Sequence, residues 1–273
     1  MKRVQRIEPS RWFVPLDVAE FWRYRGLARF FLLRDVKTRY RQMHLGAAWM
    51  ILRPLVTIVI FSVIFGNLAG IATGTNVPYP LWVTPGVLVF AYVSSALSAT
   101  SACLVGNSGI ITKVYFPRLY VPLSAALNPI VDFLLGLIVL FGLFAYFHRV
   151  PSWHVVFLPA FLALSILLVV GLGLWFSALT TRYRDVIFIA PFLTQAWQFL
   201  TPVIYPASLA AGHGFPLEWN PMTAVVAGFR WSLLGLPFGS LLALETSIPI
   251  ALGLTLSGLL VFRRAERLMA DML

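Results

Sequence analysis

Long apolar runs separated by short polar segments dominate the chain. Six of these runs have the length that a helix needs to cross a membrane, about 20 residues, and proline, glycine or charged residues mark their ends. The predicted spans are residues 46–66, 82–105, 122–147, 153–179, 187–205 and 242–262. The pattern predicts an all-α membrane protein with six transmembrane helices.

Composition supports a membrane domain. Of the 273 residues, 59% are hydrophobic and only 11% are charged, too few polar side chains to cover a soluble fold of this size. We expect a single membrane domain over residues 46–263, between a cytoplasmic N-terminal segment, 1–45, and a cytoplasmic tail, 264–273. Cys103 is the only cysteine, so no disulfide can form within the chain.

The net charge of +11 could indicate a nucleic-acid partner, but the placement of the charges argues against one. Of the 21 lysines and arginines, only Arg149 and Arg230 lie outside the N-terminal segment and first span, the second-to-third and fourth-to-fifth loops and the C-terminus. Basic residues are retained on the cytoplasmic side of membrane proteins, so both termini are predicted to be cytoplasmic.

A basic and amphipathic stretch precedes the first span. On a helical reading its apolar side chains form one stripe, Phe30, Leu33, Val36, Tyr40 and Met43, and its cations form another, Arg34, Lys37 and Arg41. Such a helix lies in the membrane interface and contacts anionic lipid. The alternative is an ordinary solvated charge run. Arg53 falls roughly 10 Å beyond Gly46, so it either snorkels or faces a polar interior.

Catalytic chemistry is poorly represented in the sequence. The four histidines are scattered without metal-ligand spacing, and none of the three lysines follows glycine as a phosphate-binding loop requires. We therefore expect no enzyme activity, no metal site and no cofactor in this chain. Asp132 is the one acidic residue well inside a span; it belongs either to a proton path or to a hydrogen bond between helices.

Two cytoplasmic loops have the character of contacts for a partner that supplies energy. The loop between Val105 and Pro122 combines cations with hydrophobic side chains that we expect to be exposed, a combination that marks a contact surface. Its candidate residues are Ile110, Ile111, Lys113, Phe116 and Arg118. The alternative for this loop is a solvated turn. The turn after the fourth span carries Arg182, Arg184 and Asp185, which suit either a partner contact or the electrostatics of helix ends.

The external segment from Pro202 to Gly235 is too long for a hairpin and too apolar for a solvated loop. Irregular backbone at membrane depth is tolerated only where protein or a watery cavity covers it. We expect two short re-entrant helices, broken near Gly212–Gly214, that form a gate. A structured external cap is the alternative.

Four stretches together resemble the permease subunit of ABC exporters for cell-surface polysaccharides, of the O-antigen and teichoic-acid type. They are RDVKTRYRQMHLGAAWMILRPL, NSGIITKVYFPRLYVPL, LTTRYRDVIFIAPFLTQAWQFLTPVIYP and WNPMTAVVAGFRWSLLG, in this order along nearly the whole chain. The resemblance implies a homodimer in the cytoplasmic membrane that binds two ATPase subunits, which hold ATP and magnesium, and that exports a lipid-linked glycan.

The same resemblance implies roles for individual residues. The interface helix would contain Arg34, Lys37, Tyr40 and Arg41. A coupling or gating helix toward the ATPase would lie in residues 110–118, and external gate helices would lie in residues 205–230, with Tyr205, Asn220 and Pro221. Arg53 stands where this family often has an uncharged polar residue such as glutamine.

Aromatic side chains in the spans suit a glycan path, because sugars pack their C–H faces on rings. The candidates are Phe90, Tyr92, Trp175, Trp197 and Phe199. Packing and interfacial anchoring explain the same rings. The competing functions are a permease for another lipid or drug, a membrane-embedded glycan-modifying enzyme and a proton-coupled secondary transporter.

Overall fold

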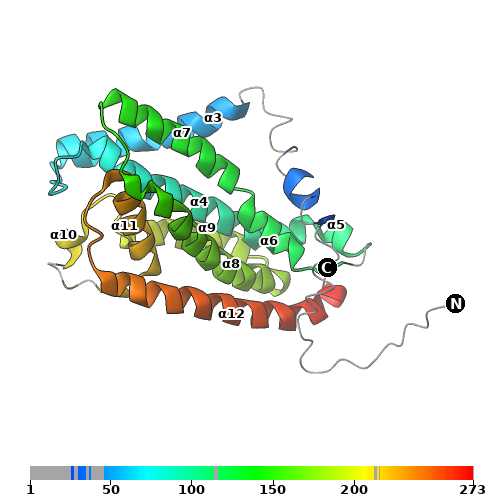
Figure 1. Ribbon diagram of the computed structural model, residues 1–273. Coiled ribbons are helices and arrows are strands. Elements are labelled where there is room, and N and C mark those ends of the chain that lie inside the picture. Colours follow the sequence, from blue (N-terminus) through cyan, green and yellow to red (C-terminus); the bar gives the residue numbers. More distant parts are fainter. Residues whose placement is uncertain are drawn as a thin grey trace.

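The computed structural model describes residues 26–27, 30–34, 37, 46–113, 116–211, 214 and 216–272, and their regular secondary structure is entirely helical. The helices form an elongated bundle (Figure 1). The elements are α3 (Gly46–Phe61), the π-helical η1 (Ser62–Leu68), α4 (Tyr79–Gly106), α5 (Ser108–Ile111), α6 (Tyr120–Leu127), α7 (Ile130–Tyr146), η2 (Trp153–Phe157), α8 (Leu158–Arg182), α9 (Val186–Leu200), α10 (Ala207–Ala211), η3 (Leu217–Trp219), α11 (Pro221–Leu234) and α12 (Leu241–Met272).

Five helical segments are long and apolar enough to cross a membrane: Ile51–Leu68, Tyr79–Gly106, Tyr120–Tyr146, Trp153–Arg182 and Leu241–Glu266. They correspond to five of the six predicted spans and confirm a helical multi-pass membrane protein. α6 and α7 form one of them, interrupted at Asn128–Pro129, because proline has no N–H for the helical ladder.

The predicted span 187–205 is shorter in the structure. Its helix, α9, has 15 residues, fewer than the about 20 that a crossing takes. It ends at Leu200 because Thr201 precedes Pro202, and the residue before a proline is driven out of the helical region. Thr201 has φ −106° and ψ 140°, an extended conformation.

α4 forms the centre of the bundle. It packs against α3, α6, α7, α8, α9 and α11, and 67% of its most apolar stretch is buried. The first span is the opposite case, with 6% buried. The core therefore forms around α4, whereas α3 and η1 present most of their apolar side chains outward.

α8 and α12 make the most extensive helix contact among the described residues, and glycines face each other across it. A Cβ on Gly258 would meet the carbonyl oxygen of Gly171, and a Cβ on Gly171 would meet the backbone of Leu254 and Thr255 at 2.8 Å. Thr255 Oγ1 also donates to the Leu167 carbonyl across the contact, at 3.0 Å. Because glycine has no side chain, the two helix backbones can approach each other at these positions.

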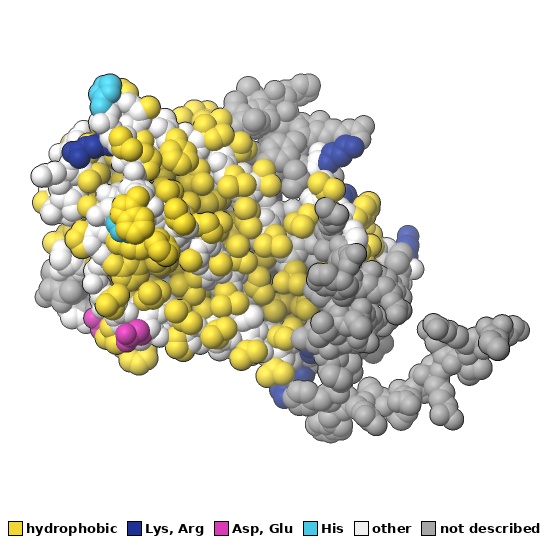
Figure 2. All heavy atoms as spheres, in the orientation of Figure 1, with side chains coloured by type: hydrophobic (Ala, Val, Ile, Leu, Met, Phe, Trp, Pro, Cys, Tyr) yellow, Lys and Arg dark blue, Asp and Glu magenta, His cyan; other side chains and the backbone are white. Residues whose placement is uncertain are grey.

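The bundle has two ends with different contents. α5 and the last turns of α12 lie at one end, called the α5 end here, and α10 and α11 lie at the other, the α10 end (Figure 1). Between the ends the visible surface is mostly hydrophobic and shows no charged side chain among its described residues; charged side chains lie instead at its margins (Figure 2). A water-soluble protein does not expose so large an apolar patch, but a protein surrounded by lipid does.

Candidate functional site at the two ends of the bundle

The 107–118 loop at the α5 end is packed onto its own chain. Ile111 and Phe116 are only 6% and 5% exposed and lie in a hydrophobic cluster with Phe31 and Phe262. The rings of Phe31 and Phe116 lie 5.5 Å apart. The expectation that Ile111 and Phe116 are exposed for a partner is therefore wrong, because the N-terminal segment and α12 cover them. Ile110 is half-buried against the same cluster.

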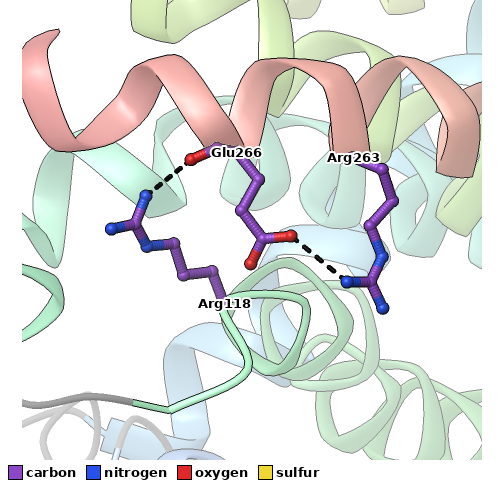
Figure 3. A network of polar contacts seen from close by, with 3 residues as sticks. All are labelled: Arg118, Arg263 and Glu266. Atoms are coloured by element: carbon purple, nitrogen blue, oxygen red, sulfur yellow. Dashed lines mark hydrogen bonds and ion pairs between the residues drawn. The ribbon is translucent and has the colours of Figure 1, made fainter. Parts of the chain in front are cut away.

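Two arginines tie this loop to elements distant in sequence. Arg34 Nη2 donates to Asn107 Oδ1 at 2.7 Å, at the start of the loop. Arg118 Nη1 donates to the main-chain carbonyl of Glu266 at 2.8 Å, and the Glu266 carboxylate pairs with Arg263 at 3.5 Å (Figure 3). Arg118 thus connects the loop to α12 within the chain, a role that the sequence analysis did not anticipate.

The remaining predicted contact residues are exposed. Lys113 is exposed in the 107–118 loop, and Arg182, Arg184 and Asp185 are exposed in the turn between α8 and α9. α9 begins directly after Asp185, whose main-chain carbonyl accepts from the amides of Phe188 and Ile189. The charged side chains of this turn are accessible to a partner at the α5 end.

The described part of the N-terminal helix has two unlike faces. Phe31 is buried and Arg34 lies over its ring, 4.9 Å from the centroid. Phe30 and Leu33, from the predicted apolar stripe, are 56% and 69% exposed. Lys37 is exposed as well. Tyr40 and Arg41 lie outside the described residues.

At the α10 end, Asn220 joins α9 to α11. Its Oδ1 accepts from the Trp197 indole at 2.9 Å and from the Met222 amide at 3.1 Å, the second bond being an N-cap for α11. Its Nδ2 donates to the Leu200 carbonyl at 3.1 Å. Pro221 occupies the first helical position, where its missing N–H costs nothing. Asn220 and Pro221 thereby start α11 beside the end of α9.

Arg230 of α11 reaches the same region from the other side. It is 8% exposed, and its Nη1 and Nη2 donate to the carbonyls of Pro202 and Val203 at 2.8 and 2.6 Å. Its Nε donates to the Trp82 carbonyl at 3.3 Å, and its guanidinium lies 3.5 Å from the Trp82 ring centroid. The distribution of basic residues in the sequence indicates only that Arg230 lies on the external side. A lone arginine within an apolar helix was the available signal of a special role.

Two tyrosines complete the bonding of the 200–204 turn, which comprises the last residue of α9 and the non-helical residues 201–204. Tyr79 Oη donates to the Ile204 carbonyl at 2.6 Å. Tyr205 Oη donates to the Phe199 carbonyl at 3.1 Å. Side chains therefore supply donors to the main-chain carbonyls where helical bonding stops, as backbone in an apolar environment requires.

The aromatic residues proposed to line a path fall into two groups. Phe90 and Tyr92 of α4 are buried in the core of this chain, so neither ring faces a channel in this structure. α4 packs against six neighbouring helices, which an apolar sequence alone does not reveal. Trp197 is half-buried with its ring edge-on to Phe90 at 6.0 Å, whereas Phe199 is 52% exposed.

Proteins named as export permeases or transport proteins are similar to this chain over most of its length. The chain is 27% identical over 217 residues to the O-antigen export system permease protein RfbA of Myxococcus xanthus, covering 78% of this chain and 82% of the relative. It is 24% identical over 240 residues to the O-antigen export system permease protein RfbA of Klebsiella pneumoniae, covering 85% and 91%. It is 23% identical over 201 residues to the polysialic acid transport protein KpsM of Escherichia coli, covering 71% and 76%.

A family model agrees with these pairwise matches. The model for ABC-2 type transporters matches residues 27–234, from the N-terminal helix through the end of α11. The matched range includes the 107–118 loop, the turn after α8 and the residues of the 200–204 turn. This chain therefore belongs to the ABC-2 type transporter family.

Proposed function

We propose that this chain is the transmembrane permease subunit of an ATP-driven exporter that moves a lipid-linked polysaccharide, of the O-antigen, capsule or teichoic-acid class, across the cytoplasmic (inner) membrane. The observation that carries the proposal is the match over most of the chain to permeases named for O-antigen export and polysialic acid transport. Membership of a transporter family and five apolar helices support it.

α9 serves as a sixth, short span. Its 15 residues reach about 22 Å, and the 200–204 turn extends it toward the α10 end. An even number of spans places both termini on one side. The distribution of lysine and arginine supports a cytoplasmic α5 end and an external α10 end, with residues 46–263 as the membrane domain, 1–45 before it and 264–273 after it. α10 and α11 then form re-entrant gate helices.

The N-terminal helix lies in the cytoplasmic interface of the membrane. Its exposed Phe30 and Leu33 dip into the acyl boundary, while Lys37 meets anionic headgroups. The opposite face, Phe31 with Arg34, packs on the 107–118 loop. Movement of this loop is thereby transmitted to the membrane interface.

Two ATPase subunits, which hold ATP and magnesium, bind at the α5 end of a dimer of this chain. Lys113 and the exposed turn with Arg182, Arg184 and Asp185 are the contacts that remain accessible there. Both contacts adjoin one cluster, because Leu174 and Ala178 near the end of α8 pack with Ile111 and Phe116. Closure of the ATPases would push this cluster and tilt the attached spans.

A second copy of the chain covers the exposed apolar faces of α3 and α9, and the glycan passes at the seam. α9 supports this arrangement, because its outward face carries the polar Gln195 among exposed hydrophobic side chains such as Phe192 and Phe199. An amide facing lipid lacks hydrogen-bond partners, whereas a path for sugars supplies them.

Co-purification with the ATPase tests the proposal. The tagged chain is expressed with the ATPase encoded beside it, and subunit stoichiometry and hydrolysis rate are measured in lipid. We expect two copies of each subunit and hydrolysis that depends on the assembled complex. A chain that never binds an ATPase would overturn the proposal. Assembly without export of a lipid-linked glycan in vesicles would assign another cargo.

A further inference from the structure

Arg230 is a buried cation whose partners are unusual. Its bonds go to three main-chain carbonyls, and its guanidinium stacks on the Trp82 ring. No carboxylate among the described residues forms an ion pair with it. Buried charges are ordinarily paired with an opposite charge. Here the carbonyl dipoles and the Trp82 ring stabilise the guanidinium charge instead. The proposed export function assigns no role to Arg230 and Trp82.

The geometry fits arginine specifically. The guanidinium donates through two nitrogens in a rigid planar fork, and Pro202 and Val203 present two successive carbonyls to that fork. Its flat face also covers Trp82, which lies on α4. A lysine ammonium is a point charge without a planar face and could not make the same set of contacts.

The arginine also fills its site closely. Gly86, one turn after Trp82 on α4, would place a Cβ 3.3 Å from Val203 Cγ1 and 3.6 Å from Arg230 Nη2. α4, α11 and the 200–204 turn therefore meet at one point with little free space. α10 differs from this point, because Ala207, Ser208 and Leu209 are exposed.

We propose that Arg230, stacked on Trp82, is a positioning residue that fixes the 200–204 turn against α4. The end of α9, the turn and α11 then move with α4 as one body. Opening at this end is confined to α10, which follows the fixed turn. The relevance of this confinement to glycan passage rests on the proposed function, whereas the positioning itself does not.

Thiol accessibility at position 203 tests the positioning. Val203 is fully buried and lies in the turn, and Cys103 is the only native cysteine. The Val203→Cys substitution is made in a Cys103→Ala background, and the purified chain in lipid nanodiscs is labelled with a water-soluble maleimide. We expect labelling to be about tenfold or more faster after Arg230→Lys, the effect of one lost charge-assisted hydrogen bond on an opening equilibrium.

Three further substitutions make the result specific. Arg149→Lys is the matched control, because Arg149 makes a single bond at the same end, from Nη2 to the Asn76 carbonyl at 2.9 Å, and it should leave the labelling of position 203 unchanged. Ser208→Cys on the exposed α10 should label rapidly whether residue 230 is arginine or lysine. Trp82→Leu removes the stacking but keeps Arg230, so it should give a smaller increase than Arg230→Lys.

Equal labelling rates in the Arg230 and Arg230→Lys proteins would overturn the proposal. If Arg230→Lys does not accumulate in the membrane, Trp82→Leu decides: faster labelling of position 203 supports the positioning, and an unchanged rate overturns it. The assay needs neither the ATPase nor a glycan, so failure of the export function does not affect its outcome.

Discussion

An arginine donates hydrogen bonds to main-chain carbonyls at each end of the bundle, but the two arginines differ in burial and in the number of their bonds. Arg230 at the α10 end is buried, donates to three carbonyls and stacks on Trp82. Arg118 at the α5 end is half-exposed and donates to a single carbonyl, that of Glu266. A buried network resists change, whereas one partly solvated bond exchanges readily with water. The comparison indicates a fixed 200–204 turn at the α10 end and an adjustable 107–118 loop at the α5 end, where the ATPase is proposed to act.

The largest effect is expected from removing the arginine of the fixed end. Arg230→Met keeps an apolar stem but leaves the carbonyls of Pro202 and Val203 without their donors, at about 1–3 kcal/mol for each buried group. We expect a total loss of about 3–5 kcal/mol in the free energy of unfolding, measured by thermal unfolding of the purified chain. Arg149→Met is the control and should cost less than about 1 kcal/mol. Equal destabilisation of both would remove the distinction between the ends.

A smaller effect is expected from the contact that links the two ends. α12 runs between them: Ser247 Oγ donates to the Pro221 carbonyl near one end, and Glu266 accepts from Arg118 at the other. Gly258→Ala would press a methyl group into α8 and cost about 1–3 kcal/mol by overpacking.

The matched control for this contact is Gly253→Ala on the same helix, where an added Cβ meets nothing within 4 Å. Alanine favours a helix over glycine by roughly 0.5–1 kcal/mol, so this variant should be slightly stabilised. If the two alanine variants have the same unfolding temperature, α8 and α12 are not closely packed at Gly258.

The smallest change in stability is expected at the adjustable end. Arg118→Ala removes one partly exposed hydrogen bond, about 1 kcal/mol, but it disconnects the 107–118 loop from α12. We expect nearly unchanged thermal stability together with lower transport-coupled ATPase activity of the reconstituted complex. Arg263→Ala removes only the partly exposed pair with Glu266, worth about 0.2–0.5 kcal/mol, and should leave that activity intact. Unchanged coupling after Arg118→Ala would show that the loop does not transmit force to α12.

The sequence predicted the helices well because each membrane helix satisfies its own backbone and needs a minimum apolar length. Five predicted spans lie within a few residues of observed helices, apart from the C-terminal extension of α12. The prediction for α9 overran its end because the apolar run continues through Pro202 to Tyr205, although the helix stops at Leu200. Hydrophobicity does not mark that stop, but the Thr201–Pro202 step does.

The contacts at the site were harder to predict because they join distant positions. Arg230 and Trp82 are 148 positions apart, as are Arg118 and Glu266. No local period contains such pairs. Phe90 could not be assigned to the core for a different reason: a membrane helix is apolar on every face, so its sequence does not separate the buried face from the lipid-facing one. The roles of Tyr40 and Arg41 stay predictions.

The 200–204 turn has a consequence for how its sequence can evolve. It contains no glycine and no residue with positive φ, so beyond the Thr201–Pro202 step that ends α9 little in its own residues dictates its path. Its carbonyls are held by Tyr79, 125 positions before Ile204, and by Arg230, 27 positions after Val203. The conformation of this bend therefore depends on side chains of α4 and α11. Substitutions at positions 79 and 230 would accumulate only in step with changes in the bend itself, even though neither residue belongs to it.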